Sequence, residues 1–575
     1  MNSLIGLAVP SRRLAVLFGG VLLGLLAGCS EQGEEEASVR EGQVRNGVLS
    51  YSASDFFKAG EGRPGGTLRA SVMLDTATLD IHSIAHGNIQ WLGRLIFDGL
   101  VYLDEKGNPS PWLASSWTIS EDGRVYTFRL REDVTFSDGT PFNAEAVRVN
   151  LEHMRDPATK SPLAAAYIAP YVSGRVIDEY TFEATLREPY TPFLDVLAQS
   201  WLSMISPKQI LEAPATIAEH PIGTGPFVVE RYQRGQGLKL VRRADYNWAP
   251  PLIGHQGPAY LERIELDFVP EALIRFSTLL SGEYDLTLDA PPQNAVALRD
   301  NPQFSLHSRI RSGNPFRSLT FNVEKAPFDD VRVRQALAIG IDREGLAWIS
   351  GFGEYVVKSD FLAANTRHYD PSHVGGLAYD PEAAARLLDE AGWTGRDAEG
   401  FRTKDGQRLS AVLQISENPA FPSSVAVALQ ADVQKLGFDL QLRVLPVAEL
   451  MEKRYAGDFQ LLGGGYWHSN TPDGLFMLYH SGAIPTERLI GQNVGRLRDE
   501  TLDALLSQAR SSQNAEEQRS LYAQAQQRLT ELVPAVPAYE SHHLIAYNRD
   551  LKGVVFDTSH NTPILTTAWL DRGRP

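Results

Sequence analysis

The sequence predicts a mixed α/β fold built from more than one lobe. The chain has 575 residues, of which 43% are hydrophobic, and this is enough apolar surface for a sizeable core. A helical pattern over 425–436 stops at Gly437 and leads directly into a segment over 438–444 whose apolar and polar residues alternate. A helix followed at once by a strand is typical of a sheet flanked by helices. Cys29 is the only cysteine, which excludes disulfides, cysteine zinc sites and thiol catalysis from the folded part.

Residues 1–29 have the pattern of a lipoprotein signal peptide. A pair of arginines precedes an apolar stretch over 14–26, and small residues then lead to Cys29. We expect Cys29 to be lipidated and to become the mature N-terminus. A transmembrane anchor is the alternative, but the apolar stretch is shorter than the roughly 20 residues that span a bilayer. Residues 30–64, rich in Glu, Gly, Ser and Arg, are expected to form a flexible tether.

The folded part is expected to begin with a strand over 68–72 and a helix over 89–100. The local signals agree best in the stretch 111–154. After a Glu-Asp-Gly turn, Val125–Leu130 alternates between apolar and polar residues, which predicts a half-buried strand. Asn143 then has the features of a helix N-cap, with an acidic residue in the first turn, where the helix dipole favours negative charge.

A second clear helix start lies at Asp380, an N-cap followed by proline at the first helical position. Gly392 is expected to close this helix, because glycine adopts the left-handed conformation at a helix end without strain.

Composition and motifs argue against several classes of function. The net charge is −16 and no basic cluster appears, so we expect no nucleic-acid partner. The sequence contains no nucleophile elbow, no zinc-protease motif, no phosphate-binding loop and no dinucleotide fingerprint. The glycine runs at 223–225 and 463–465 lack the lysine or the helix entry that phosphate binding needs. We therefore expect a protein that is not an enzyme and that has no cofactor and no resident metal.

The stretch from Pro111 to Met154 contains two tryptophans five apart, followed by YTF-x-LR, F-x-DG-x-PF and A-x-x-V. With these motifs it resembles the signature of the family 5 solute-binding proteins, the extracytoplasmic receptors of bacterial peptide and nickel ABC importers. Further family-like stretches follow in the expected order. They lie at 223–227, 245–248, 321–322, 327–344, 379–393, 429–445 and 472–481.

The resemblance implies a two-lobed periplasmic-binding-protein fold of type II, in the large three-domain variant, with a hinge and a cleft between the lobes. It implies a monomer, lipid-anchored in the periplasm or at the cell surface, that delivers a small-molecule or peptide ligand to ABC transporter permease subunits. The implied boundaries are lobe I at 65–104, 221–315 and 537–575, a small extra domain at 105–220, and lobe II at 316–536.

The richest candidate ligand site is the stretch 463–473. Its glycines let backbone approach a ligand, and its aromatic and polar side chains offer stacking faces and hydrogen bonds. In peptide-binding relatives an aspartate a few residues before a Pro-Asp step binds the ligand's α-amino group, whereas this chain has the neutral Asn470 there. The candidate residues of this stretch are Tyr466, Trp467, His468, Asn470 and Asp473.

Three further candidates lie elsewhere. His82 and His86 are four apart, a spacing that suits metal ligands on a helix, but we interpret His82 as a loop histidine near the cleft, as the resemblance implies. Lys160 and Trp201 stand where nickel-binding relatives have chelate-binding arginines. Those relatives also place a histidine where this chain has Gly474.

The ligand class stays open between a peptide or peptide-like compound, an opine-like conjugate and a metal–chelator complex. We expect the ligand to carry at least one carboxylate. Two alternatives remain: the candidate residues only pack the wall of the cleft, or the chain is a sensory or surface protein that uses the same fold without import.

Overall fold

The structure is a computed structural model in which residues 43–575 form one compact unit. It describes residues 43–45, 48–50, 61–84, 88–104, 106–310, 317–357, 361–364, 366–373, 375–416, 423–464, 471–486, 491–540, 542–558 and 561–572.

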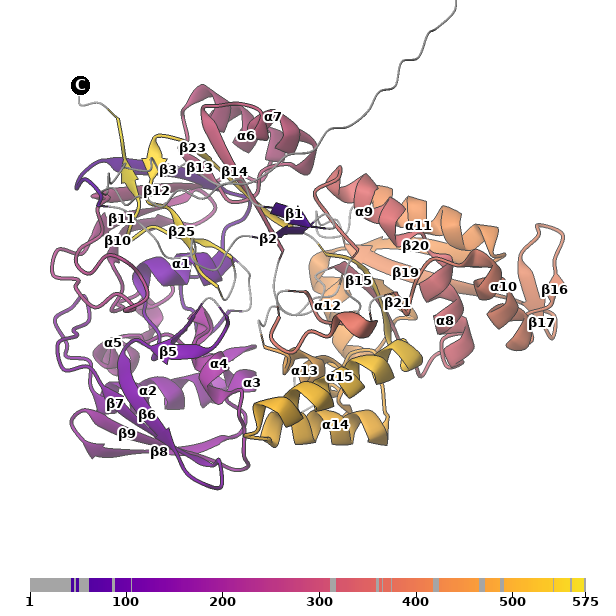
Figure 1. The fold of residues 1–575 in the computed structure, drawn as a ribbon, viewed down its shortest axis with the longest axis horizontal. Helices are drawn as coiled ribbons and strands as arrows, with labels where there is room; N and C mark the ends of the chain where they lie inside the picture. Colours follow the sequence, from indigo (N-terminus) through magenta and orange to yellow (C-terminus); the bar gives the residue numbers. More distant parts are fainter. Residues whose placement is uncertain are drawn as a thin grey trace, which may run out of the picture. The chain divides into compact units, whose positions relative to one another are not determined.

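A seven-stranded sheet has the strand order β10-β11-β12-β3-β13-β23-β14 (Figure 1). β3 lies at its centre, parallel to β12 and β13, and the other neighbours pair antiparallel. The strands are β3 Thr67–Val72, β10 Phe227–Gln233, β11 Gly237–Arg242, β12 Arg263–Phe268, β13 Leu286–Thr287, β14 Phe304–Ile310 and β23 His542–Asn548. The helices beside it are α1 Asn88–Ile96, α6 Ala272–Ser281 and α7 Ala295–Arg299.

Residues 105–220 contain a four-stranded antiparallel sheet of order β6-β7-β9-β8. Tyr126, Phe128 and Phe182 from this sheet belong to the same hydrophobic core as Leu68 and Ile264 of the seven-stranded sheet, so this part packs as an extension of that core. Its strands are β6 Ala114–Ile119, β7 Val125–Leu130, β8 Tyr171–Asp178 and β9 Thr181–Leu186. Its helices are α2 Ala144–Arg155, η2 Pro157–Thr159, α3 Ala164–Tyr167, α4 Phe193–Leu197, η3 Ser200–Leu202, α5 Pro207–Glu212 and η4 Pro214–Thr216.

A five-stranded sheet of order β20-β19-β21-β15-β22 has a separate core. β19 is parallel to β20 and β21, while β15 pairs antiparallel with β21 and β22. The strands are β15 Arg317–Phe321, β19 Ser410–Ser416, β20 Asp439–Leu445, β21 Leu461–Gly463 and β22 Ala535–Tyr539. The helices are α8 Val331–Gly340, α9 Arg343–Gly351, α10 Pro381–Glu390, α11 Ser423–Lys435, α12 Val447–Ala456, α13 Gly474–Tyr479, α14 Glu500–Ser511 and α15 Ala515–Leu532, with the 3-10 helices η6 Pro371–His373 and η7 Ser481–Ala483. A further 3-10 helix, η5 Pro292–Asn294, precedes α7.

The chain passes between these two sheets twice. β14 of the seven-stranded sheet is followed by β15 of the five-stranded sheet, and β22 is followed by β23 on the return. Short strands complete the fold. They are β1 Gln43–Arg45 with β2 Val48–Ser50, β4 Val101–Leu103 with β5 Pro109–Pro111, β16 Gly395–Arg396 with β17 Arg402–Lys404 and β18 Gln407–Arg408, β24 Leu551–Lys552 with β27 Trp569–Leu570, and β25 Val555–Phe556 with β26 Pro563–Ile564.

The locally coded predictions are confirmed. β7 covers Val125–Leu130, and α2 begins after Asn143, whose Oδ1 accepts from Ala146 N at 3.0 Å. Asp380 caps α10 in the same way, accepting from Ala383 N at 2.8 Å.

The predicted helix over 89–100 ends earlier, at Ile96. The carbonyl of Ile96 accepts a hydrogen bond from Gly225 N at 2.9 Å, so the 223–225 segment meets the end of α1. A Cβ at Gly223 would lie 2.1 Å from Ile96 O, which explains why small residues occupy this run. The segment is a packing contact for α1.

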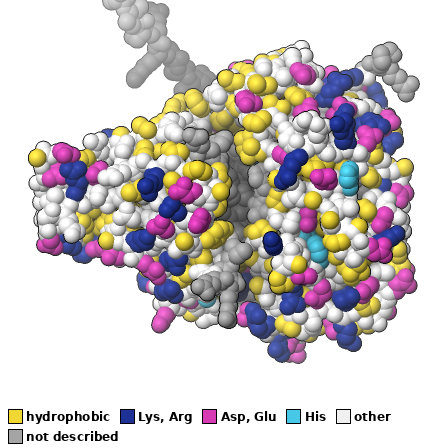
Figure 2. Space-filling view, turned by 180° about the vertical axis from the view of Figure 1, so that it is seen from behind, with side chains coloured by type: hydrophobic (Ala, Val, Ile, Leu, Met, Phe, Trp, Pro, Cys, Tyr) yellow, Lys and Arg dark blue, Asp and Glu magenta, His cyan; other side chains and the backbone are white. Residues whose placement is uncertain are grey.

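Basic and acidic side chains are mixed over the face drawn in Figure 2, and that face is hollowed. Within the described ranges, no helix has the length and apolar character needed to cross a bilayer.

Candidate functional site

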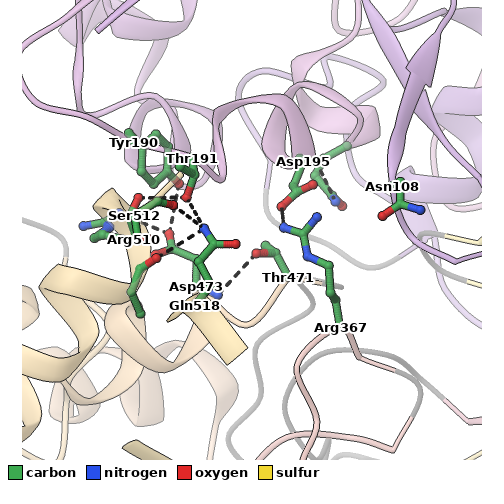
Figure 3. A network of polar contacts seen from close by, with 12 residues as sticks. Asn108, Tyr190, Thr191, Asp195, Arg367, Thr471, Asp473, Arg510, Ser512 and Gln518 are labelled. Carbon is green, nitrogen blue, oxygen red and sulfur yellow. Dashed lines mark hydrogen bonds and ion pairs between the residues drawn. The ribbon is translucent and has the colours of Figure 1, made fainter. Parts of the chain in front are cut away.

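A set of polar contacts joins residues 190–195 of the extra β6–β9 part to residues that accompany the five-stranded sheet (Figure 3). We call it the junction network. Its members are Tyr190, Thr191, Asp195, Arg367, Thr471, Asp473, Arg510 and Gln518.

Asp473 is the centre of one half of the junction network. Its Oδ2 accepts from the Tyr190 hydroxyl at 2.9 Å and from Arg510 Nη2 at 3.1 Å. The side chains of Asp473 and Arg510 are only 3% and 11% exposed, so this is a buried ion pair. Burial, followed by the nearby Asp473 charge, raises the pKa of Tyr190 well above its ordinary value, so the hydroxyl keeps its proton and donates.

Thr191 adds backbone contacts to the same half. Its amide and its hydroxyl both donate to Arg510 O at 2.9 Å. Gln518 Nε2 then donates to Thr191 Oγ1 at 2.7 Å and to Ser512 O at 2.8 Å. These bonds fix the end of α14 against the segment before α4.

Asp195 and Arg367 form the other half. Asp195 lies on α4 inside an apolar run, and Arg367 Nη2 donates to its Oδ2. Burial is the main effect on Asp195 and raises the pKa of its carboxyl, while Arg367 acts in the opposite direction. The pair joins residues 172 positions apart in the sequence.

His82 is fully buried and paired with a second histidine. Its Nε2 lies 2.9 Å from the carbonyl oxygen of Ser203, so Nε2 carries the hydrogen and donates. Nδ1 of His82 is then the acceptor, 3.0 Å from Nδ1 of His153. Burial, the largest effect, lowers the pKa of His82 to about 4, so the ring is neutral at pH 7.

Two other predicted residues lie in contrasting places. Trp201, on η3, is 1% exposed and stacks on Tyr167, with ring centroids 6.2 Å apart. Lys160 is exposed and follows η2 in the left-handed conformation, with φ 51°. The structure therefore buries Trp201 in the hydrophobic core that also contains α4 and leaves Lys160 in solvent.

The remaining predicted residues lie outside the described ranges. These are Cys29, His86, Tyr466, Trp467, His468 and Asn470. Asp473 is the one candidate residue named from the 463–473 stretch that lies in the described part of the chain, and it belongs to the junction network together with Thr471 of the same stretch.

The sequence reasoning missed Asp195, Arg367, Tyr190 and Arg510. A signal existed for Asp195, because an aspartate inside the apolar run Phe193–Leu197 is a charge that folding buries and that needs a partner. The partner itself had no signal, because Arg367 is one of many basic residues in the chain.

In the described part of the chain, no three His, Cys, Asp or Glu side chains are grouped closely enough to hold a metal ion. In the His82–His153 pair, the two Nδ1 atoms share a hydrogen bond with each other, and Nε2 of His82 is bonded to the carbonyl oxygen of Ser203.

The chain matches the family model for "Bacterial extracellular solute-binding proteins, family 5 Middle" over residues 108–484. It is 28% identical over 485 residues to the glutathione-binding protein GsiB of Shigella dysenteriae serotype 1, covering 83% of this chain and 89% of that protein. It is also 28% identical over 393 residues to the nickel-binding periplasmic protein of Escherichia coli K12, covering 66% and 71%. Among solved structures, the periplasmic binding protein DppA of Helicobacter pylori, in complex with the peptide STSA, superposes with a TM-score of 0.74. That match has 24% identity and covers 89% of this chain and 99% of DppA.

Proposed function

Because this chain belongs to the bacterial extracellular solute-binding proteins of family 5, we propose that it captures a small polar ligand between two lobes and delivers it to an ABC importer. The predicted two-lobed α/β fold of the periplasmic binding proteins is confirmed. For the lobes we propose the predicted boundaries, with lobe I at 65–104, 221–315 and 537–575, the extra domain at 105–220 and lobe II at 316–536. The last boundary falls inside β22, which pairs with β15 of the five-stranded sheet. The two chain passages between the sheets are the natural hinge.

The junction network is the observation that carries this proposal. Tyr190 reaches Asp473 and Arg367 reaches Asp195 across the boundary between the extra domain and lobe II. Such bonds form only when the two parts are close, and they break when the lobes separate. A ligand that contacts both parts adds binding energy to the closed arrangement alone, and so shifts the population toward it.

The ligand is a peptide or peptide-like compound, or a metal–chelator complex. Relatives named for glutathione and for nickel support this range. An opine-like conjugate is compatible with the same kind of site. We propose that the ligand carries at least one carboxylate, and that residues 466–473 together with His82, Lys160 and Trp201 contribute to its site.

Mutation separates the roles of these residues. Lys160→Ala and His468→Ala are each expected to lower the affinity for the ligand by tenfold or more. Asn470→Asp is expected to shift preference toward free peptides, because an acid restores a charge-assisted hydrogen bond to an α-amino group. Tight binding of plain dipeptides to the wild type, unchanged in these variants, would remove this assignment.

We further propose that lipidated Cys29 anchors the protein and that 30–64 form its tether. Stable membrane anchoring takes two acyl chains, or one acyl chain together with a second membrane-binding feature, and a diacylated cysteine supplies two acyl chains. Function needs no covalent chemistry, since differential affinity between the open and closed forms is sufficient.

The decisive experiment is small-angle X-ray scattering of the purified protein with and without the ligand found by native mass spectrometry. We expect the radius of gyration to fall on binding and calorimetry to show a single binding heat. Continued heat release with product formation would identify an enzyme instead. A gene neighbourhood without permease and ATPase genes would favour the sensory or surface alternative.

A further inference from the structure

The junction network contains two aspartate–arginine pairs that are held very differently. Asp473 and Arg510 both belong to lobe II, so their pair persists when the lobes separate. Within lobe II, the guanidinium carbon of Arg510 lies 3.6 Å from the ring centroid of Phe476. The ring of Tyr190, whose centroid is 4.7 Å from this carbon, belongs to the extra domain and leaves when the lobes separate. This pair is part of the permanent core of the protein.

The Asp195–Arg367 pair is different because it joins the extra domain to lobe II. The Arg367 side chain is 26% exposed, and no ring in the described residues stacks on its guanidinium. When the lobes separate, Arg367 leaves with lobe II. Asp195 then stays behind, because α4 packs into the core of the extra domain.

The cost of leaving Asp195 without a partner arises in the closed arrangement. There its side chain is only 4% exposed, and a buried carboxylate needs a counter-charge or a proton. A closed, ligand-bound form in which Arg367 is displaced therefore needs another cation at α4. Arg367 binds this carboxylate only when no other cation does.

The pair is also incomplete when it is formed. A fully engaged arginine–carboxylate pair uses two parallel bonds and both oxygens. Here Nε of Arg367 is buried and has no hydrogen-bond partner, and a side-chain hydrogen bond from Thr471 also reaches the Asp195 carboxyl. Arg367 therefore engages the carboxylate less fully than a bidentate guanidinium would.

A second unsatisfied group lies on α1, next to η3. Gln90, on α1, is 2% exposed, and neither its Oε1 nor its Nε2 has a partner. The Ser200 hydroxyl donates to the Gln90 carbonyl at 2.8 Å, which ties this part of α1 to η3, the segment that follows α4. Buried polar atoms in folded proteins are nearly always paired, so a bound molecule is expected to supply the missing partners here.

We propose that Asp195 is a cation subsite of the ligand-binding site, where a guanidinium or ammonium group of the solute replaces Arg367. The proposal rests on the function proposed above and names the charge of one ligand group. Without a ligand, the guanidinium of Arg367 occupies the place that we propose for the cationic group of the solute. It thereby indicates which kind of chemical group the carboxylate binds.

The test uses two dipeptides, Gly-Arg and Gly-citrulline, which differ by a charged guanidinium against a neutral urea of nearly the same shape. Titration calorimetry on the full chain should show Gly-Arg binding at least tenfold more tightly than Gly-citrulline. Asp195→Asn should remove this preference, weakening Gly-Arg by tenfold or more and Gly-citrulline by less than twofold. Arg367→Gln should bind Gly-Arg at least as tightly as the wild type, because the internal competitor is gone.

Asp178→Asn is the matched control, since that carboxylate belongs to the same domain and its side chain is 55% exposed. It should leave both affinities unchanged. If Asp195→Asn and Arg367→Gln weaken the two dipeptides equally, the pair only holds the lobes together and the subsite is overturned. Gly-Arg that binds the wild type no more tightly than Gly-citrulline also overturns it, while closure on any other solute in the scattering experiment leaves the proposed function standing.

Discussion

Replacing Asp473 with asparagine leaves the guanidinium of Arg510 buried without its counter-ion. The two side chains are 3% and 11% exposed, so water cannot replace the lost charge. Removing one partner of a buried ion pair costs about 3–5 kcal/mol, because the remaining charge stays in a poorly solvating environment. Asparagine keeps one oxygen that can accept from Tyr190, so we expect a loss near the lower end, about 3 kcal/mol.

The assay is urea unfolding followed by circular dichroism, with the midpoint and the slope both measured. Asp473→Asn should lower the midpoint, whereas the exposed Lys160→Ala should stay within about 0.5 kcal/mol of the wild type. The double variant Asp473→Asn with Arg510→Met should be more stable than Asp473→Asn alone, because methionine removes the unpaired charge. A wild-type midpoint for Asp473→Asn, or strictly additive effects in the double variant, would refute the buried-pair argument.

Three further outcomes are expected. Cys29→Ala should lose membrane association and keep its fold; a mutant that still sediments with membranes would contradict the lipid anchor. The pKa of His82 is about 4 when folded against about 6.5 when unfolded, so stability present above pH 6.5 is lost as pH falls toward 4. The loss amounts to about 3 kcal/mol. His82→Gln should flatten this dependence in urea midpoints measured from pH 4 to 7.5, and an unchanged slope would assign it to other groups. Gly225→Ala should cost about 1–3 kcal/mol in thermal unfolding, because its Cβ would lie 2.4 Å from the carbonyl carbon of Ile96; a stability equal to that of the wild type would show that α1 can move aside.

The sequence by itself determined the elements whose partner atoms lie a few residues apart. The caps at Asn143 and Asp380 bond amides three residues on, and the strand Val125–Leu130 follows from alternation along one segment. The helix predicted over 89–100 was too long, and the strand predicted over 438–444 lies one residue later, at Asp439–Leu445. The amide of Gly225 donates to the carbonyl oxygen of Ile96 at the end of α1. At the end of β20 the buried residue is Leu445, whereas Val444 is exposed. Both differences come from packing against distant segments.

Only the tertiary structure decided which charges meet. Tyr190 and Asp473 are 283 residues apart, and Asp195 and Arg367 are 172 apart. Such pairs cannot be predicted from local sequence, because they depend on how two separately folded parts dock. Asp473 was predicted to face the ligand from its place near a family motif, yet its Oδ2 is already taken by Tyr190 and Arg510. Burial is what gives these pairs their energy, and burial is a property of the assembled fold.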